Sequence, residues 1–319
     1  MKSSFLKISL ATVVLVAILG GCGILKNLLD SKIEQHNTDS NTYKSELDQA
    51  DNDINDALAD IDGFGKTDYH DQIFSSPLCG VTIDCTDVSQ GILYFNFDGT
   101  TPCFSPSRTR AGQIKVELIN GNAWADAGAV LRQTFIDFRV THLASGRSIE
   151  FDGVKTLKNL DGHDWWQFLL GQTTFAYESR STNMEVTFDN GATADWNHAR
   201  TVTWSYHPAN TVPGIPYAHI GFAASGDTTI NGTSGIDSWG TNRFGSDFIT
   251  YYNQPLLSNT YCGLWRFNSG ELVHEVDGDD YTLTLGVDQN GNPSTGTCAY
   301  GFEVSWNVGN NSNSQIFSY

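Results

Sequence analysis

Basic residues are scarce in this chain of 319 residues. Eighteen lysines and arginines stand against 36 aspartates and glutamates, which gives a formal net charge of −18 at pH 7. Nucleic acids and anionic lipid headgroups are bound through basic patches, so this balance argues against both as partners.

The motifs of common catalytic and metal sites are also missing. The cysteines form no C-x-x-C pair, and the histidines show no paired spacing of zinc ligands. Residues 232–235 read GTSG and lack the G-x-S-x-G spacing of a nucleophile elbow, while His274-Glu275 lacks the second histidine of a zinc protease. Residues 288–293 read DQNGNP, with proline where a calcium loop needs glycine. We therefore predict no catalytic residue, no metal and no cofactor.

No apolar run reaches the ~18 residues that a membrane-spanning helix needs. A run of 13 residues follows MKSSFLK and precedes Gly21-Cys22, which is the pattern of a secretory signal. Leu19-Gly20-Gly21-Cys22 resembles the lipobox of bacterial lipoproteins, and the resemblance implies cleavage before a lipid-modified Cys22. Two or more acyl chains give stable membrane anchoring. We expect a signal peptide at 1–21 and a lipid anchor; a secreted protein with an incidental cysteine is the alternative.

Residues 22–72 differ from the rest of the chain. Between 30 and 71, twelve acidic side chains stand against three lysines. Leu47, Ile54, Leu58 and Ile61 recur at helical spacing before Gly63. We predict an acidic stalk with one short amphipathic helix, whose narrow apolar stripe packs on the main domain.

The remainder, residues 73–319, shows the pattern of antiparallel strands. Apolar residues alternate with polar ones in several runs, and Asn-Gly or Asp-Gly pairs, including Asp152-Gly153, fall between such runs. We count twelve to fifteen strands from the sequence, too many for one flat sheet. The pattern predicts an all-β fold, an antiparallel β-sandwich or a curled multi-strand meander, preceded by one short N-terminal helix. The runs with alternation are these: 114–118, 184–188, 202–206, 281–287 and 300–308.

Several short segments of the chain resemble segments of a known group of proteins. CGVTID at 79–84, FDGTTPC…RTRAGQI at 97–114, GTNRFG, the later C…SGEL and GTCAYGFEVSW resemble uncharacterised β-rich lipoproteins of the Bacteroidota. The family's Gly-Lys-Ile step is altered here to Ala-Gly-Gln-Ile. The resemblance implies an all-β lipoprotein of the cell envelope, and it implies no activity, substrate or catalytic residue.

Five cysteines remain besides Cys22, and in an exported protein they are expected to pair. Cys262 and Cys298 flank two alternating runs and are expected to form one disulfide. Cys103 can pair with Cys79 or Cys85, and we favour Cys79 because both then lie at one end of neighbouring strands. The segment 97–113 is thus predicted to be a pinned structural loop, with Arg108 or Arg110 paired to a carboxylate.

Two groups of residues are candidates for function. Tryptophans lie near turns and polar residues, where an exposed ring can stack on a sugar, although each of them can also cap the core; these are Trp124, Trp165, Trp166 and Trp239. An acidic group could supply the paired carboxylates of a glycoside hydrolase, although such clusters are mostly solvated; it comprises Glu271, Glu275, Asp277, Asp279 and Asp280. His274 shares its strand face with Leu272 and Val276, which favours a core or edge histidine.

We therefore expect a lipid-anchored protein of the outer membrane, facing either side, that contacts the membrane through its anchor. Its β domain is expected to be a non-enzymatic module that binds a glycan or an envelope protein. A structural component of the envelope without a small-molecule ligand, and an exported glycoside hydrolase, are the alternatives.

Overall fold

The computed structural model describes residues 31–61, 73–75, 78–103, 108–162, 173–207, 219–263, 266–308 and 311–319. The chain divides into two compact units between Asp60 and Ile61. The first contains the helix α2, and the second contains the sixteen strands β1–β16 and the short 3-10 helix η2 (Val88–Gln90).

Helix α2 (Ser31–Asp60) is 30 residues long, longer than the short helix predicted. Neither glycine nor proline occurs between Gly23 and Gly63, so no residue in α2 interrupts the backbone pattern. Gln35 donates to Asp39 at 2.7 Å and Gln49 donates to Asp53 at 2.9 Å, the i,i+4 pairing that supports a polar helix. Across the described residues, no helix combines the length and the hydropathy needed to span a bilayer.

The second unit contains sixteen strands, numbered in chain order. They are β1 (Ile73–Ser75), β2 (Val81–Asp84), β3 (Ile92–Asp98), β4 (Arg108–Asn120), β5 (Val130–His142), β6 (Ser148–Asn159), β7 (Thr174–Phe188), β8 (Thr193–His207), β9 (His219–Gly226), β10 (Thr228–Ile230), β11 (Thr233–Thr241), β12 (Asp247–Asn259), β13 (Phe267–Val276), β14 (Asp279–Val287), β15 (Gly301–Val308) and β16 (Asn311–Ser318).

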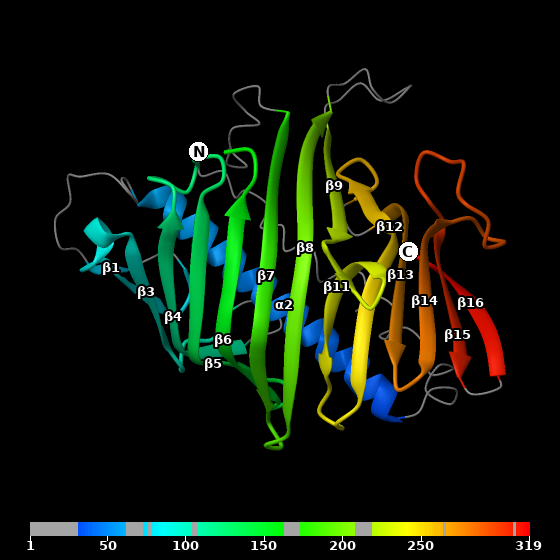
Figure 1. Cartoon of the computed structure of the whole chain (residues 1–319), viewed down its shortest axis with the longest axis horizontal. Helices are drawn as coiled ribbons and strands as arrows, with labels where there is room; N and C mark the ends of the chain where they lie inside the picture. The colour runs from blue at the N-terminus through cyan, green and yellow to red at the C-terminus, as the bar shows by residue number, and fades with distance from the viewer. Residues whose placement is uncertain are drawn as a thin grey trace. The chain divides into compact units, whose positions relative to one another are not determined.

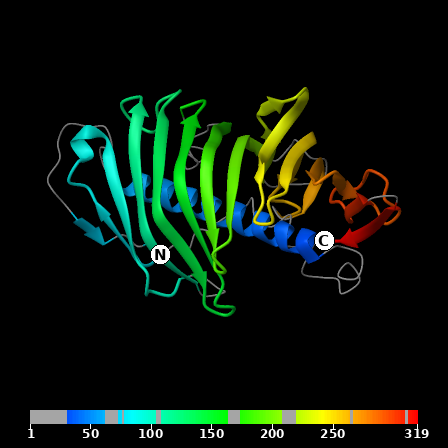
Figure 2. The same cartoon turned by 60° about the horizontal axis from the view of Figure 1, so that its bottom comes forward.

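All sixteen strands belong to one antiparallel sheet whose order largely follows the chain. Figure 1 shows this sheet from β1 to β16, and Figure 2 shows its curvature. The all-β prediction is confirmed, and of the two architectures expected the sheet is the curled meander. Strand twist curves so large an antiparallel sheet, because each strand is rotated relative to its neighbour.

The order departs from a simple meander next to β8. This strand is 15 residues long, and two shorter strands share the space between it and β12. Strand β9 pairs with β8 from Arg200 to His207, whereas β11 pairs with β8 from Asp195 to His198. Both shorter strands also pair with β12. Strands β9 and β11 therefore both lie between β8 and β12, with β9 along one end of β8 and β11 along the other.

The predicted alternation sets the buried face of the sheet. Met184, Val186 and Phe188 are buried in β7, as are Tyr281, Leu283 and Leu285 in β14. Aromatic rings from β3, β5 and β6 pack together on this face, with centroids 4.9 Å apart for Phe97–Phe138 and 6.0 Å apart for Phe138–Phe151. Burial of such rings is the main source of stability in a sheet of this kind.

Two local predictions are wrong. Asp152-Gly153 was expected in a turn, but it lies inside β6, where the pairing with β7 shifts between Asp152 and Val154. The alternating run 300–308 placed Tyr300 on the buried face, but Tyr300 precedes β15 and is 41% exposed. In both places a bulge interrupts the regular pairing, and turn chemistry or alternation in the sequence does not reveal a bulge.

Candidate functional site

A line of side chains crosses five strands on the partly exposed face of the sheet. Direct strand pairing places Asn197 opposite Trp239, Trp239 opposite Ile249, Ile249 opposite Glu275, and Glu275 opposite Asp280. All five side chains are partly exposed, whereas the adjoining Ser238, Thr250 and His274 are buried on the other face. We call these residues the aromatic–acidic row: Asn197, Trp239, Ile249, Glu275 and Asp280.

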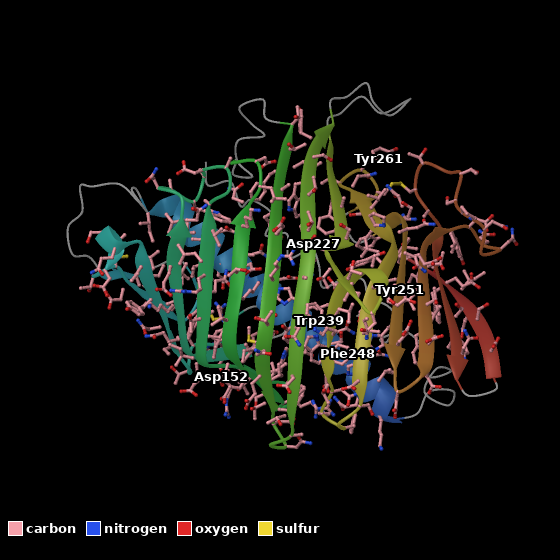
Figure 3. The ribbon with its side chains drawn as sticks, in the orientation of Figure 1. Asp152, Asp227, Trp239, Phe248, Tyr251 and Tyr261 are labelled. Atoms are coloured by element: carbon pink, nitrogen blue, oxygen red, sulfur yellow. A yellow bond between two sulfur atoms is a disulfide. The ribbon has the colours of Figure 1, made fainter. Side chains whose placement is uncertain are left out.

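A bulge in β11 directs Trp239 to this face. Ile236 pairs with Tyr251 and Ser238 pairs with Thr250, so Asp237 is the extra residue of the strand. The bulge shifts the alternation by one position, because two residues on the bulged strand oppose one on the partner. Trp239 therefore shares a face with Tyr251, and Figure 3 shows the two residues on neighbouring strands.

Tyr251 lies on the same face as the row and forms a hydrogen bond with one of the row's carboxylates. Its hydroxyl donates to Oε1 of Glu275 at 2.8 Å, and its ring is partly exposed. Burial, the hydrogen bond to Glu275 and the nearby negative charges of Asp280 and Glu271 raise the pKa of Tyr251 to about 12. The phenol therefore stays protonated at neutral pH and remains a hydrogen-bond donor.

The acidic residues predicted between 271 and 280 come together only in part. Glu271 and Glu275 lie on the same face of β13, and Asn253 donates to Oε1 of Glu271 at 2.6 Å. Asp280 lies directly opposite Glu275, whereas Asp277 belongs to the hairpin turn. The row, together with Tyr251 beside it, therefore brings two carboxylates, an amide and two aromatic rings onto one face of the sheet.

The surroundings of Asp280 in the row raise its pKa. Burial raises the pKa of Asp280, and the negative charges of Glu275 and Asp279 raise it further. The native state consequently binds the Asp280 proton more tightly than the unfolded chain does. Stability is therefore lost as the pH rises from the ordinary carboxyl range through the raised pKa.

We expect Asp280→Asn to stabilise the protein at pH 7. Like charges directly opposite in a sheet cost about 0.2–1 kcal/mol, and the amide removes that repulsion. The gain should disappear at a pH low enough to protonate Asp280 in the parent chain. Thermal unfolding between pH 3 and pH 7 measures both effects. Asp277→Asn, the same change in the adjoining turn, is the control, and an equal gain there at pH 7 would contradict this prediction.

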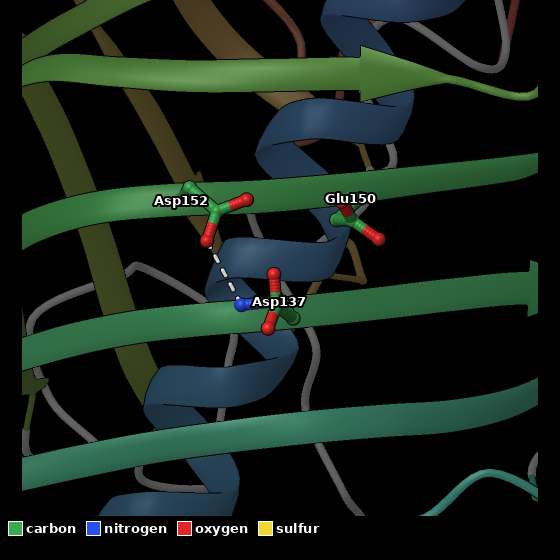
Figure 4. A group of neighbouring side chains, drawn as sticks. All are labelled: Asp137, Glu150 and Asp152. Carbon is green, nitrogen blue, oxygen red and sulfur yellow. Dashed lines mark hydrogen bonds between the residues drawn. The ribbon is translucent and has the colours of Figure 1, made fainter. Parts of the chain in front are cut away.

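A second acidic group lies on β5 and β6. Carboxylate oxygens of Asp137, Glu150 and Asp152 all lie within 4.8 Å of one another (Figure 4). The backbone N–H of Asp137 donates to Oδ1 of Asp152 at 2.8 Å, and Nη2 of Arg139 lies 2.6 Å from Glu150. Oxygen ligands of this kind suit a hard cation such as Ca²⁺. Because the Arg139 cation and the Asp137 amide already contact two of the three carboxylates, we interpret the group as a polar support for the β5 bulge.

The four predicted tryptophans have different outcomes. Trp239 was expected in a loop, but it lies in the middle of the sheet and is partly exposed. Trp124 is only 6% exposed, and its carbonyl accepts a hydrogen bond from Asn159 at 2.9 Å, so its ring does not offer a stacking surface. Trp165 and Trp166 lie outside the described residues.

Two disulfides form as predicted, Cys79–Cys103 and Cys262–Cys298, with Cα atoms 5.7 and 5.5 Å apart. Cys85 is a buried free thiol, and burial, with the charge of Asp84, raises the pKa of Cys85 to about 11. A thiol of this kind is protonated at neutral pH and therefore unreactive.

In segment 97–113, of which residues 104–107 lie outside the described residues, the predicted disulfide joins Cys103 to Cys79. Nη2 of Arg110 donates to the Cys79 carbonyl at 3.3 Å, and its guanidinium carbon lies 4.8 Å from the centre of the Phe97 ring. The disulfide thus ties the residues before β2 to the connection after β3, and Arg110 in β4 contacts both Cys79 and the end of β3. The pairing of Arg108 or Arg110 with a carboxylate stays a prediction.

Two histidines are buried in the sheet, and for one of them, His274, the sequence predicted a core or edge position. His274 is 7% exposed, and its Nδ1 lies 2.8 Å from the Thr250 hydroxyl. His198 is held between two hydroxyls, 2.8 Å from Ser179 and 2.7 Å from Ser181. Both ring nitrogens of His198 are therefore engaged, which favours a structural role over that of a catalytic base.

Sequence reasoning missed Tyr251 as a site residue. Its alternation with Ile249 indicates a shared strand face, but nothing in the segment FITYYNQ indicates that Glu275 lies beside it.

Comparison of the chain with protein-family models, curated proteins and solved structures gives no match.

Proposed function

We propose that this protein is a lipid-anchored protein of the bacterial cell envelope whose β domain binds a glycan through the aromatic–acidic row. The lipobox-like segment ending at Cys22 supports the anchor. The disulfides Cys79–Cys103 and Cys262–Cys298 support an oxidising compartment outside the cytoplasm. The acidic composition supports neither nucleic acid nor an anionic headgroup as the ligand.

The observation that carries this proposal is the common surface of Trp239, Tyr251 and Glu275. A sugar ring has apolar faces that stack on aromatic rings, and hydroxyl groups that donate to carboxylates. Trp239 and Tyr251 supply the ring faces, Glu275 supplies an acceptor beside Tyr251, and Asp280 lies opposite Glu275 on the next strand. Strand pairing holds all four on the sheet, so little side-chain freedom is lost when a ligand binds.

An array of neutral and acidic oligosaccharides, probed with the full-length chain in detergent, tests the proposal. We expect binding to at least one glycan, and Trp239→Ala is expected to weaken that binding roughly tenfold or more, because central aromatic residues dominate such contacts. Tyr251→Phe should have a smaller effect, since it keeps the ring and removes only the hydroxyl.

The control is Phe244→Ala, which removes an aromatic side chain 39% exposed in the turn of the same β11–β12 hairpin. It should leave glycan binding unchanged. Thermal unfolding of each variant separates lost binding from lost structure. If the parent chain binds no glycan on the array, or if Trp239→Ala and Phe244→Ala lose equal amounts of glycan binding, the proposal is contradicted. Either result favours a structural component of the envelope.

A further inference from the structure

An open pocket lies on the surface beside the Cys262–Cys298 disulfide, away from the aromatic–acidic row. It has a volume of about 450 Å³, and the connection between β14 and β15 forms most of its wall. Its polar and aromatic lining residues are Arg266, Asp288, Gln289, Asn290, Ser294 and Tyr300. We call it the disulfide pocket.

The backbone around the disulfide pocket is held by several independent constraints. Oδ1 of Asp288 accepts hydrogen bonds from the backbone N–H groups of Asn290 and Asn292, at 2.8 and 2.9 Å. Val287 forms a β-bridge with Pro293, and Cys298 in the wall is bonded to Cys262. The pocket is therefore largely formed before a ligand arrives, as small-molecule sites usually are.

Two exposed tyrosines flank the disulfide. Tyr261 precedes Cys262 and is 50% exposed, and Tyr300 follows Cys298 by two residues and is 41% exposed. Figure 3 labels Tyr261 in the connection that follows β12. Tyr300 lines the disulfide pocket, so its partly exposed ring offers a flat apolar surface there.

Arg266 gives the pocket a fixed cation. Its Nη2 donates to the Ala299 carbonyl at 2.8 Å, and its guanidinium carbon lies 5.9 Å from the centre of the Tyr319 ring. The Tyr319 hydroxyl in turn donates to the Phe267 carbonyl at 2.9 Å, which ties the residue after β16 to the start of β13. No lysine or arginine follows Arg266 in the sequence.

We propose that the disulfide pocket binds a neutral pyranose sugar, with one sugar face on Tyr300 and the hydroxyl groups on Arg266, Asp288 and Asn290. The lining offers a cation, a carboxylate, two amides and two hydroxyls, which together match the mixed donors and acceptors of sugar hydroxyls. Asp288 is kept ionised by the two backbone N–H groups that lower its pKa, so it opposes an anionic ligand. Arg266 opposes a cationic ligand in the same way.

Saturation-transfer NMR with the full-length chain in detergent tests this proposal. The probes are the methyl glycosides of glucose, galactose, mannose and N-acetylglucosamine, with methyl glucuronide as the anionic comparison. We expect transfer to at least one neutral glycoside and weaker transfer to the glucuronide. Tyr300→Ala is expected to reduce the neutral signal roughly tenfold, whereas Phe244→Ala should not change it.

The second comparison separates the disulfide pocket from the aromatic–acidic row. Trp239→Ala should retain the transfer that Tyr300→Ala removes. If Trp239→Ala abolishes all binding and Tyr300→Ala changes none, the pocket proposal is overturned and the row is supported. The pocket proposal is also overturned if no neutral glycoside shows saturation transfer, or if the glucuronide shows stronger transfer than the neutral glycosides. Tyr300 is exposed and lies outside a strand, so its replacement should leave the thermal unfolding temperature unchanged.

Discussion

Replacing Cys79 and Cys103 together with alanine is expected to lower the free energy of unfolding by about 3 kcal/mol. The disulfide joins residues 24 apart in the sequence, and removing it restores the freedom of that loop in the unfolded chain. The loop contains β2 and β3, so the first strands of the sheet should also become easier to detach. Urea unfolding of the double variant against the parent chain measures the difference.

Two controls make the disulfide prediction specific. A reducing agent should lower the stability of the parent chain, and it should affect the double variant only through Cys262–Cys298. Cys85→Ala removes a buried thiol that forms no disulfide, and its effect should be smaller. Glycan binding through Trp239 should survive the loss of Cys79–Cys103, because the row lies on β8 and β11–β14. An unchanged urea midpoint in the double variant would contradict the assignment of segment 97–113 as a pinned structural loop.

Gly240→Ala is expected to destabilise the protein by more than about 2 kcal/mol and to weaken glycan binding as well. Gly240 has a φ of 155°, and a Cβ there would lie 1.9 Å from the backbone oxygen of Asp195. The atom it meets belongs to the backbone of β8, so the clash can be relieved only by separating β8 from β11. That separation would move Trp239, the residue just before Gly240, out of line with Asn197.

Gly245→Ala is the matched control for this prediction. Gly245 has a φ of 81°, and a Cβ there meets nothing within 4 Å. This replacement should cost only the backbone strain of about 1–2 kcal/mol, without loss of glycan binding. Urea unfolding and the glycan array together measure both variants. Equal losses of stability and binding in the two variants would show that the close approach of β8 and β11 is not what positions Trp239.

Strand class and disulfide pairing could both be predicted, because their signals are local. Period-two alternation as in 184–188 is a property of one strand, and it indicates which side chains are buried whatever the neighbouring strand is. Cys262 precedes β13 and Cys298 follows β14. Because β13 and β14 are neighbours in the sheet, the two cysteines lie at the same end of this strand pair. Bulges escaped prediction, since the extra residue Asp237 looks like any other polar residue in a strand.

The sequence by itself determined that this chain forms many antiparallel strands after a helix and that its composition disfavours nucleic acid, and it favoured the two disulfides that form. Only the tertiary structure decided that Trp239, Tyr251 and Glu275 share one surface, and that Tyr300 borders a pocket. The physical reason is that neighbours across a sheet are set by the register between strands. Register depends on bulges and on the sharing of one sheet position by β9 and β11, and neither has a signature within a single strand.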